Sequence, residues 1–351
     1  MIKTFSPYYK IIPWVSPSLL LPASSYVLNV YVWEGLKADV PIVPIAEVEN
    51  VNPFELVSDT KVNISSFIKG YIDNNMVTNT TTSLNNSNGM VWVKTEVIYT
   101  VSGVVQSVEL IEIDSAVNGY AYGIEGENTT IPSNGYLATT VEQKVFKDGV
   151  YIFNVLGDEV EDVEIKLLSE NVTKELTIVN TTDSAKLIQS VYVVVSEFDG
   201  DYIEVYKDDV LINTLLITDE QRFEPIDIVF QNKEGQHQTV TFFKEKINTL
   251  KVERESYESF NGQPKDGVHQ FKDYNVNGQE SFSINSGWVK EDNNEVFTQL
   301  LLSNVVWQIK DGLYIPINLG TETLEYKSQN KDVLINYKID FKYSYYKINN
   351  A

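Results

Sequence analysis

Carboxylates are the side chains of this sequence best suited to chemistry, and one close group of them lies near the C-terminus. Glu291, Asp292 and Glu295 fall in a segment whose apolar residues recur at helical spacing. Two neighbouring carboxylates can act as a general acid and a general base. At about 100° per residue, however, Glu291 and Glu295 point away from the apolar stripe, and acidic groups in a first turn favourably oppose the helix dipole. We therefore interpret this group as solvent-facing surface charge.

A second acidic group offers the oxygen ligands that calcium prefers. It comprises Asp199, Asp201 and Glu204, followed by Asp208 and Asp209. Its spacing does not match an EF-hand loop, and aspartate is common in hairpin turns because its side chain bonds to the local backbone. We interpret these residues as turns and predict no metal site, with a weak cation site as the open alternative.

Composition excludes chemistry that depends on cysteine or on several histidines. The chain contains no cysteine, and its two histidines are His237 and His269. Neither accompanies a Gly-x-Ser-x-Gly or a His-Glu-x-x-His motif. Paired carboxylates of a glycosidase remain an alternative, because their separation is set by the tertiary structure. We expect no catalytic residues, no cofactor and no enzymatic activity.

The net charge of the chain is strongly negative and uneven. The 351 residues sum to −22, with −6 in residues 1–125, −13 in 126–225 and −3 in 226–351. This balance argues against direct binding of duplex nucleic acid, which relies on Lys and Arg. Prolines interrupt the apolar residues at the N-terminus, so a signal peptide is not expected, and no segment approaches the ~20 apolar residues of a membrane span. We expect the protein to stay in a cytoplasm or in a particle assembled there.

The elements that carry these residues are short alternating strands separated by turn residues. Residues 26–34 are apolar on both faces of a strand, whereas the polar run 74–89 has no apolar period and is expected to form a long exposed loop. The length suits two or three domains. The predicted fold is mainly β, with three tandem sandwich-like or barrel-like domains. The expected parts are an N-terminal arm at 1–25, a β-rich domain at 26–125, an acidic β-sandwich at 126–225, and a β-rich C-terminal domain at 226–351 with one helix.

Turn residues predict where the strands reverse. Ser102-Gly103, the segment 232–235 and Asp311-Gly312 each separate two strand-like segments. Asn277-Gly278 is the strongest short hairpin signal, because both residues accept the positive φ that a two-residue turn requires.

One helix is expected near residues 290–303, between two tryptophans. Its apolar stripe predicts that it closes one face or one open end of the last sheet, with the tryptophans at its entry and exit. The expected cap or interface residues are Trp288, Val296, Phe297, Leu300, Leu301 and Trp307. Aromatic residues are also abundant, with 21 Tyr, 15 Phe and 5 Trp, which suits both cores and subunit interfaces.

Three stretches resemble structural proteins of tailed phages that infect Bacteroidetes, including crAss-like phages. They are YVLNVYVWEGLKADVPIVPIAEVE with VNISSFIKGYI, then PIDIVFQNKEGQHQTVTFFKEK, and finally SINSGWVKEDNNEVFTQLLLSNVVWQI with YIPINL and LINYKIDFKYSYYKIN. Together they cover most of residues 26–72 and 226–350, while the middle third has only a general sandwich pattern.

This resemblance implies a non-enzymatic virion protein. Its expected form is a multi-copy ring or connector in the tail or near the portal, with copies of itself and neighbouring tail or portal-region proteins as partners. It would be assembled in the bacterial host cytoplasm. Two alternatives remain open: a module that binds carbohydrate or a host receptor through exposed Trp and Tyr, and a polysaccharide hydrolase associated with the tail.

Overall fold

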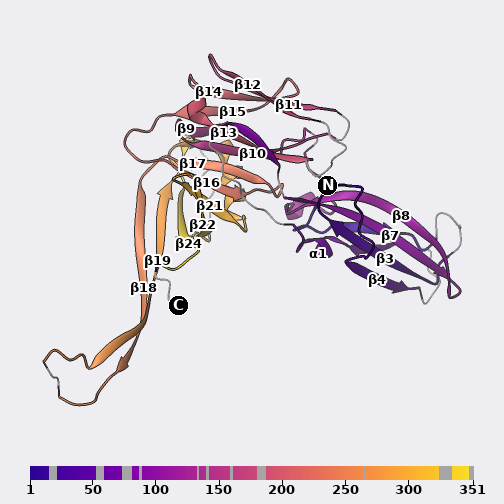
Figure 1. Cartoon of the computed structure of the whole chain (residues 1–351), viewed down its shortest axis with the longest axis horizontal. Helices are drawn as coiled ribbons and strands as arrows, with labels where there is room; N and C mark the ends of the chain where they lie inside the picture. The colour runs from indigo at the N-terminus through magenta and orange to yellow at the C-terminus, as the bar shows by residue number, and fades with distance from the viewer. Residues whose placement is uncertain are drawn as a thin grey trace.

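The computed structural model of the chain is mainly β, in agreement with the predicted fold class (Figure 1). Most of its strands lie in four larger sheets, distributed over an N-terminal, a middle and a C-terminal domain. The described residues are 1–15, 22–52, 59–72, 81–86, 89–132, 134–139, 142–158, 161–179, 187–263, 266–323 and 334–347.

The N-terminal domain is a five-stranded sheet with a small second layer. The sheet order is β1-β8-β7-β3-β4, and β2 pairs with β5 beside the short helix α1. Strand β3 is buried along most of its length, as its two apolar faces require. The bounds are β1 (Ile2–Lys3), β2 (Tyr9–Ile12), β3 (Ser25–Trp33), β4 (Ala46–Val51), β5 (Thr60–Asn63), α1 (Ser65–Ile68), β7 (Met90–Val101) and β8 (Val104–Val117).

The prediction of a free N-terminal arm at 1–25 is wrong for the described residues 1–15 and 22–25. Strand β1 pairs in parallel with β8, and β2 pairs antiparallel with β5. Ile2 and Ile12 are fully buried, and the ring centroids of Trp14 and Tyr26 lie 4.8 Å apart in the core, with the rings tilted by 52°. The prolines separate short strands without preventing the apolar residues between them from packing, so the segment is part of the domain.

The middle domain is a sandwich of two sheets. A three-stranded sheet, β10-β13-β6, faces a five-stranded sheet, β12-β11-β14-β15-β9, across a shared apolar core. Its strands are β6 (Ser83–Asn86), β9 (Gln143–Phe146), β10 (Val150–Leu156), β11 (Val163–Leu168), β12 (Thr173–Ile178), β13 (Ile188–Val194), β14 (Tyr202–Lys207) and β15 (Val210–Thr218). The 3-10 turn η1 (Gly123–Glu125) precedes these sheets in the chain, and a second 3-10 turn, η3 (Val195–Glu197), lies between β13 and β14.

Strand β6 corrects the expectation of a long exposed loop at 74–89. It pairs antiparallel with β13 of the middle domain, and Leu84 packs against that domain's core. A polar sequence can still form an edge strand because the ladder is made by backbone groups. The chain therefore crosses into the middle sandwich and returns to the first domain; residues 73–80 and 87–88 lie outside the described part.

The C-terminal domain is a seven-stranded sheet of order β17-β16-β21-β22-β24-β19-β18. A two-stranded pair, β20-β23, lies beside it. The turns predicted at 232–235 and at Asp311-Gly312 are present, the first between the end of β16 and the start of β17. The bounds are β16 (Ile226–Gln231), β17 (His237–Phe242), β18 (Lys246–Glu258), β19 (Phe271–Asn285), β20 (Val289–Lys290), η4 (Glu291–Asn293), α2 (Asn294–Leu301), β21 (Val306–Lys310), β22 (Leu313–Leu319), β23 (Leu334–Ile335) and β24 (Lys338–Tyr343).

Helix α2 is shorter than the expected segment 290–303, because its first turn is the 3-10 turn η4. Val296, Phe297 and Leu300 are buried in the core of the C-terminal domain. The Phe297 ring lies 6.0 Å from Phe242 of β17. The helix thus covers part of the sheet through its apolar face.

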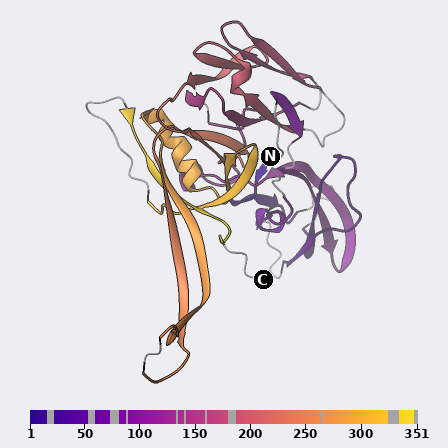
Figure 2. The same ribbon diagram turned by 60° about the vertical axis from the view of Figure 1, so that its left-hand side comes forward.

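Strands β18 and β19 form a long hairpin whose base belongs to the C-terminal sheet and whose far end projects away from the three domains (Figures 1 and 2). We call residues 246–285 the arm. Its chain reverses between Glu258 and Phe271, not at Asn277-Gly278 as the sequence predicts. Asn277 and Gly278 instead pair with Glu253 and Val252 inside the ladder. The glycine also leaves room for Leu250, whose Cδ1 would lie 3.2 Å from a Cβ atom on Gly278.

Candidate functional site

The most elaborate polar arrangement among the described residues is where the β16-β17 hairpin meets the other two domains. We call this region the junction. A hairpin tip is usually exposed because its backbone groups need water. Here the tip and β17 are buried, although almost every side chain is polar. The buried polar residues of the hairpin are Gln231, Asn232, Gln236, His237, Gln238, Thr239 and Thr241.

Asn232 shapes the turn of this hairpin. Its Oδ1 accepts hydrogen bonds from Glu234 N at 3.0 Å and Gln236 N at 3.1 Å, which closes the turn locally. Its Nδ2 donates to Leu137 O at 2.7 Å, in the segment that leads into the middle domain. One amide side chain therefore holds the turn and ties it to a second domain.

Two glycines allow the hairpin tip to touch the segment that leaves the N-terminal domain. A Cβ atom on Gly235 would lie 2.4 Å from Gly119 N, and one on Gly119 would lie 2.8 Å from Lys233 O. Gly235 also has φ +75°, a conformation that side chains disfavour. The backbones meet directly, and Tyr120 N donates to Lys233 O at 2.9 Å.

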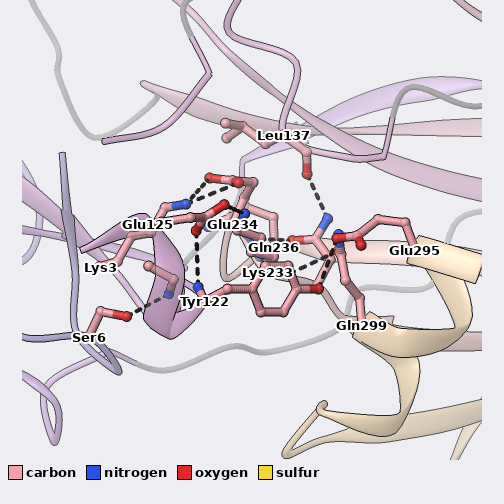
Figure 3. A network of polar contacts seen from close by, with 12 residues as sticks. Lys3, Ser6, Tyr122, Glu125, Leu137, Lys233, Glu234, Gln236, Glu295 and Gln299 are labelled. Atoms are coloured by element: carbon pink, nitrogen blue, oxygen red, sulfur yellow. Dashed lines mark hydrogen bonds and ion pairs between the residues drawn. The ribbon is translucent and has the colours of Figure 1, made fainter. Parts of the chain in front are cut away.

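Charged groups surround this contact (Figure 3). Lys3 of β1 pairs with Glu234 at 2.9 Å, and Lys233 pairs with Glu125 of η1. Burial raises the pKa of Glu234, and the Lys3 ammonium only partly offsets that effect. Burial also raises the pKa of Glu125, but hydrogen bonds from Lys233 and from the backbone outweigh it and lower the pKa overall. Two ion pairs thus hold the hairpin tip, one to β1 of the N-terminal domain and one to η1 in the segment that leaves this domain.

Helix α2 joins the same network (Figure 3). Tyr122 OH donates to Glu295 Oε1 at 2.9 Å, and Gln299 Nε2 donates to the same oxygen at 2.7 Å. Lys233 N donates to Gln299 Oε1 at 3.1 Å. Burial and the hydrogen bond to the Glu295 carboxylate both raise the pKa of Tyr122. The interpretation of Glu295 as a solvent-facing charge is therefore wrong, because its carboxylate accepts a hydrogen bond from Tyr122, in the segment that leaves the N-terminal domain.

Side chains of β17 and its turn bind the middle domain through buried polar contacts. Gln238 Oε1 accepts from Thr139 N at 3.1 Å, and Thr239 Oγ1 accepts from Ile152 N at 2.9 Å. Gln236 Oε1 accepts from Asn154 Nδ2 at 3.2 Å, while its Nε2 donates to Gly89 O of the N-terminal domain at 3.3 Å. Gln236 of the C-terminal domain therefore contacts both the middle and the N-terminal domain.

An apolar cluster completes the contact between the middle and C-terminal domains. Ile152, Tyr192 and Val229 are buried, and Trp307 packs against them. His237 lies edge-on to Trp307, with ring centroids 5.3 Å apart. Burial lowers the pKa of His237 to about 4, so its ring is neutral at pH 7. The expected exit tryptophan of the helix is thus an interdomain residue.

Asp227 of β16 lies at the same boundary. Its Oδ2 accepts from Val150 N at 3.2 Å and its Oδ1 accepts from Thr241 Oγ1 at 2.6 Å. Burial raises the pKa of Asp227 to about 6, and these two hydrogen bonds limit the rise.

The tryptophan expected at the helix entry, Trp288, has a different environment. Its side chain is 54% exposed beside a hollow of about 340 Å³ that is also lined by Phe223 and Lys244. Lys144 of the middle domain donates to the Trp288 carbonyl oxygen at 2.8 Å. Leu301, the last of the expected cap residues, is partly buried against the core.

The acidic turn residues have structural partners. Asp199 Oδ1 accepts from Ser169 Oγ at 2.7 Å and from Asn171 N at 3.0 Å. These bonds and the Asn171 side chain lower the pKa of Asp199 to about 2. Asp208 and Asp209 adopt positive φ in the β14-β15 turn. Among the described residues, no group of three or more His, Asp or Glu side chains is arranged to hold a metal ion.

Sequence motifs did not identify the junction, because its glutamines, asparagines and glycines match no catalytic or ligand pattern. One signal was present: the turn of VFQNKEGQHQ is followed by polar residues on both faces of a strand. The chain matches no protein-family model and no curated protein. Within the described part of the chain, no helix has the length and apolar character of a membrane span.

Proposed function

We propose that this chain is a non-enzymatic structural component of a tailed phage virion, forming a multi-copy ring or connector in the tail or near the portal. The observation that carries the proposal is the junction, where one buried hairpin holds three β-rich domains in a set arrangement. Such a design suits a part that transmits position and load, because buried hydrogen-bonded networks specify one geometry.

The resemblance to phage structural proteins supports this proposal at the same place. The stretch PIDIVFQNKEGQHQTVTFFKEK forms β16, the turn and β17, which are the centre of the junction. The helical stretch of the resemblance supplies Glu295 and Gln299. The partners would be further copies of the chain and neighbouring tail proteins, in virions assembled in the bacterial host cytoplasm.

The test is direct detection in particles. Mass spectrometry of purified phage should find the chain at a copy number set by a ring, and electron cryomicroscopy should place its three-domain outline in the tail region. Absence from particles of a phage that encodes it would contradict the proposal.

A second candidate function is carbohydrate binding, which the exposed Trp288 beside its hollow favours. Aromatic faces next to polar groups are suited to stacking on sugar rings. Binding on a glycan array should then be lost in Trp288→Ala and kept in Tyr202→Ala, which removes another exposed aromatic residue. A blank array with the unmodified protein would remove this candidate.

A further inference from the structure

Strand β18 leaves a long sheet edge without a described partner. It is the last strand of the seven-stranded sheet, and 12 of its 13 residues are exposed. Its apolar members Ile247, Leu250, Val252 and Tyr257 are between 41% and 50% exposed. At about 3.3 Å per residue, such an edge spans roughly 43 Å. Exposed edges of this kind bind another strand readily.

We propose that β18 is a self-association edge: it pairs antiparallel with β18 of a second copy about a two-fold axis at Val252. The two sheets would then continue into each other across the axis. The inference needs only this chain, so it is independent of the phage assignment.

Symmetry restricts how two copies of this edge can pair. Alternate residues of a strand direct their backbone groups outward, and directly opposite residues in an antiparallel ladder must be of the same kind. The axis must therefore pass through a residue of β18 opposite its own copy. The extra residue of the arm's bulge lies in β19, so β18 is regular from Lys246 to Glu258.

The axis at Val252 places opposite charges across the contact. Lys251 faces Glu253 of the second copy, and Lys246 faces Glu258, each twice by symmetry. Ile247 faces Tyr257 in the same register. Within one chain, the Lys251 and Glu253 side chains pair at 2.7 Å but are 73% and 66% exposed, so both can reach a second partner.

The neighbouring registers all bring like charges together. An axis at Lys251, Glu253 or Arg254 sets that charged residue against its own copy. An axis at Leu250 sets Lys246 against Arg254. Like charges directly opposite are destabilising in a sheet. Of the five central registers, the one at Val252 alone combines complementary charges with no like-charge pair.

The charge of the arm also favours a second copy as the partner. The arm has 5 basic and 6 acidic residues, a net charge of −1, whereas the rest of the chain carries the remaining −21. Copies of so acidic a chain repel each other through most of their surfaces. The arm projects from the rest of the chain (Figures 1 and 2), so an antiparallel arm contact would keep the two acidic bodies at opposite ends of the joined ladder.

The test uses two charge-reversed full-length chains in sedimentation velocity. Lys251→Glu and Glu253→Lys each create two like-charge contacts, and each should weaken self-association on the order of tenfold or more. An equimolar mixture of the two should recover wild-type association, because acidic side chains of one chain then face basic side chains of the other at both contacts. Lys272→Glu, which changes an equal charge on β19, is the matched control and should associate like the wild type.

The mixture distinguishes a variant that has lost the charge match from one that has lost its fold, because two misfolded variants would not regain association when mixed. A wild-type chain that remains monomeric at all concentrations would overturn the proposal, and so would charge variants that associate unchanged or a mixture that does not recover. If the chain formed rings and neither variant changed their size, the β18 contact would be overturned and the proposed virion role would remain.

Discussion

At the scale of single residues, the junction depends on glycines that let two backbones approach closely, in addition to allowing a positive φ. Gly235 and Gly312 have nearly equal φ, +75° and +74°. A Cβ atom on Gly235 would overlap the backbone at Gly119, whereas one on Gly312 would meet nothing within 4 Å. Comparing substitutions at Gly235 and Gly312 therefore distinguishes the cost of a steric clash from the cost of a positive φ.

We expect Gly235→Ala to destabilise the protein by about 3 kcal/mol, because the hairpin tip must move away from Gly119. Gly312→Ala should cost only about 1 kcal/mol, the strain of positive φ. Denaturant unfolding of both variants measures the difference. Equal losses would show that the close contact at Gly235 carries no stability.

His237 predicts a pH dependence at the same scale. Its pKa falls from the ordinary value of 6.5 to about 4 on folding, so the unfolded chain binds more protons between these values. Stability from the neutral ring is complete above pH 6.5 and is lost as the pH falls toward 4. The loss should be about 3 kcal/mol at about 1.36 kcal/mol per pKa unit.

The matched measurement compares the wild type with His237→Phe from about pH 7 to about pH 4. Other titrating groups contribute equally to both proteins, so the wild type should lose about 3 kcal/mol more than the variant. Parallel stability curves would show that His237 titrates alike in the folded and unfolded chain.

At the scale of elements, helix α2 makes contacts on two of its faces. Leu300 is fully buried against the sheet, while Glu295 binds Tyr122 of the linker from the N-terminal domain. Glu291, in the preceding 3-10 turn, is exposed. The helix is thus both a cover for the sheet and a contact to another domain.

Leu300→Asp should unfold the C-terminal domain, because an unpaired carboxylate replaces a buried side chain at a cost of about 4 kcal/mol or more. Glu291→Gln should change the free energy of unfolding by no more than about 0.5 kcal/mol. Circular dichroism during thermal unfolding distinguishes them. A larger loss in the glutamate variant would contradict the covering role of the helix.

At the scale of the whole molecule, the junction should make the domains unfold together. Gln238 accepts a hydrogen bond from Thr139 N in the segment leading to the middle domain and another from Asn232 in the hairpin. Gln238→Leu keeps the volume but removes this acceptor, so Thr139 N loses it and Asn232 Nδ2 keeps only Leu137 O, a cost of about 1 to 3 kcal/mol.

Calorimetry should show one main transition for the wild type and a lower, divided transition for Gln238→Leu. Gln263→Leu, in the exposed turn of the arm, is the control and should unfold like the wild type. If Gln238→Leu unfolded at the wild-type temperature in one step, the junction would not couple the domains.

Local patterns in the sequence predicted the elements well. Alternation predicted the strand at 26–34, Asp311-Gly312 predicted a hairpin, and apolar spacing predicted a helix within 290–303. These features are decided by neighbours along the chain, so a single sequence contains them. The mainly β class follows from the same local preferences.

Other features depended on partners distant in the chain. Asn277-Gly278 became part of a long ladder because β18 lies opposite it, and polar β6 became a strand because β13 offered an edge. Glu295 is partly buried and the glutamines of the hairpin are buried because three domains meet around them. The sequence by itself determined where the apolar strands lie and which face of the helix is apolar. Only the tertiary structure decided which polar groups lose water, because burial and hydrogen-bond partners come from segments that the chain brings together when it folds.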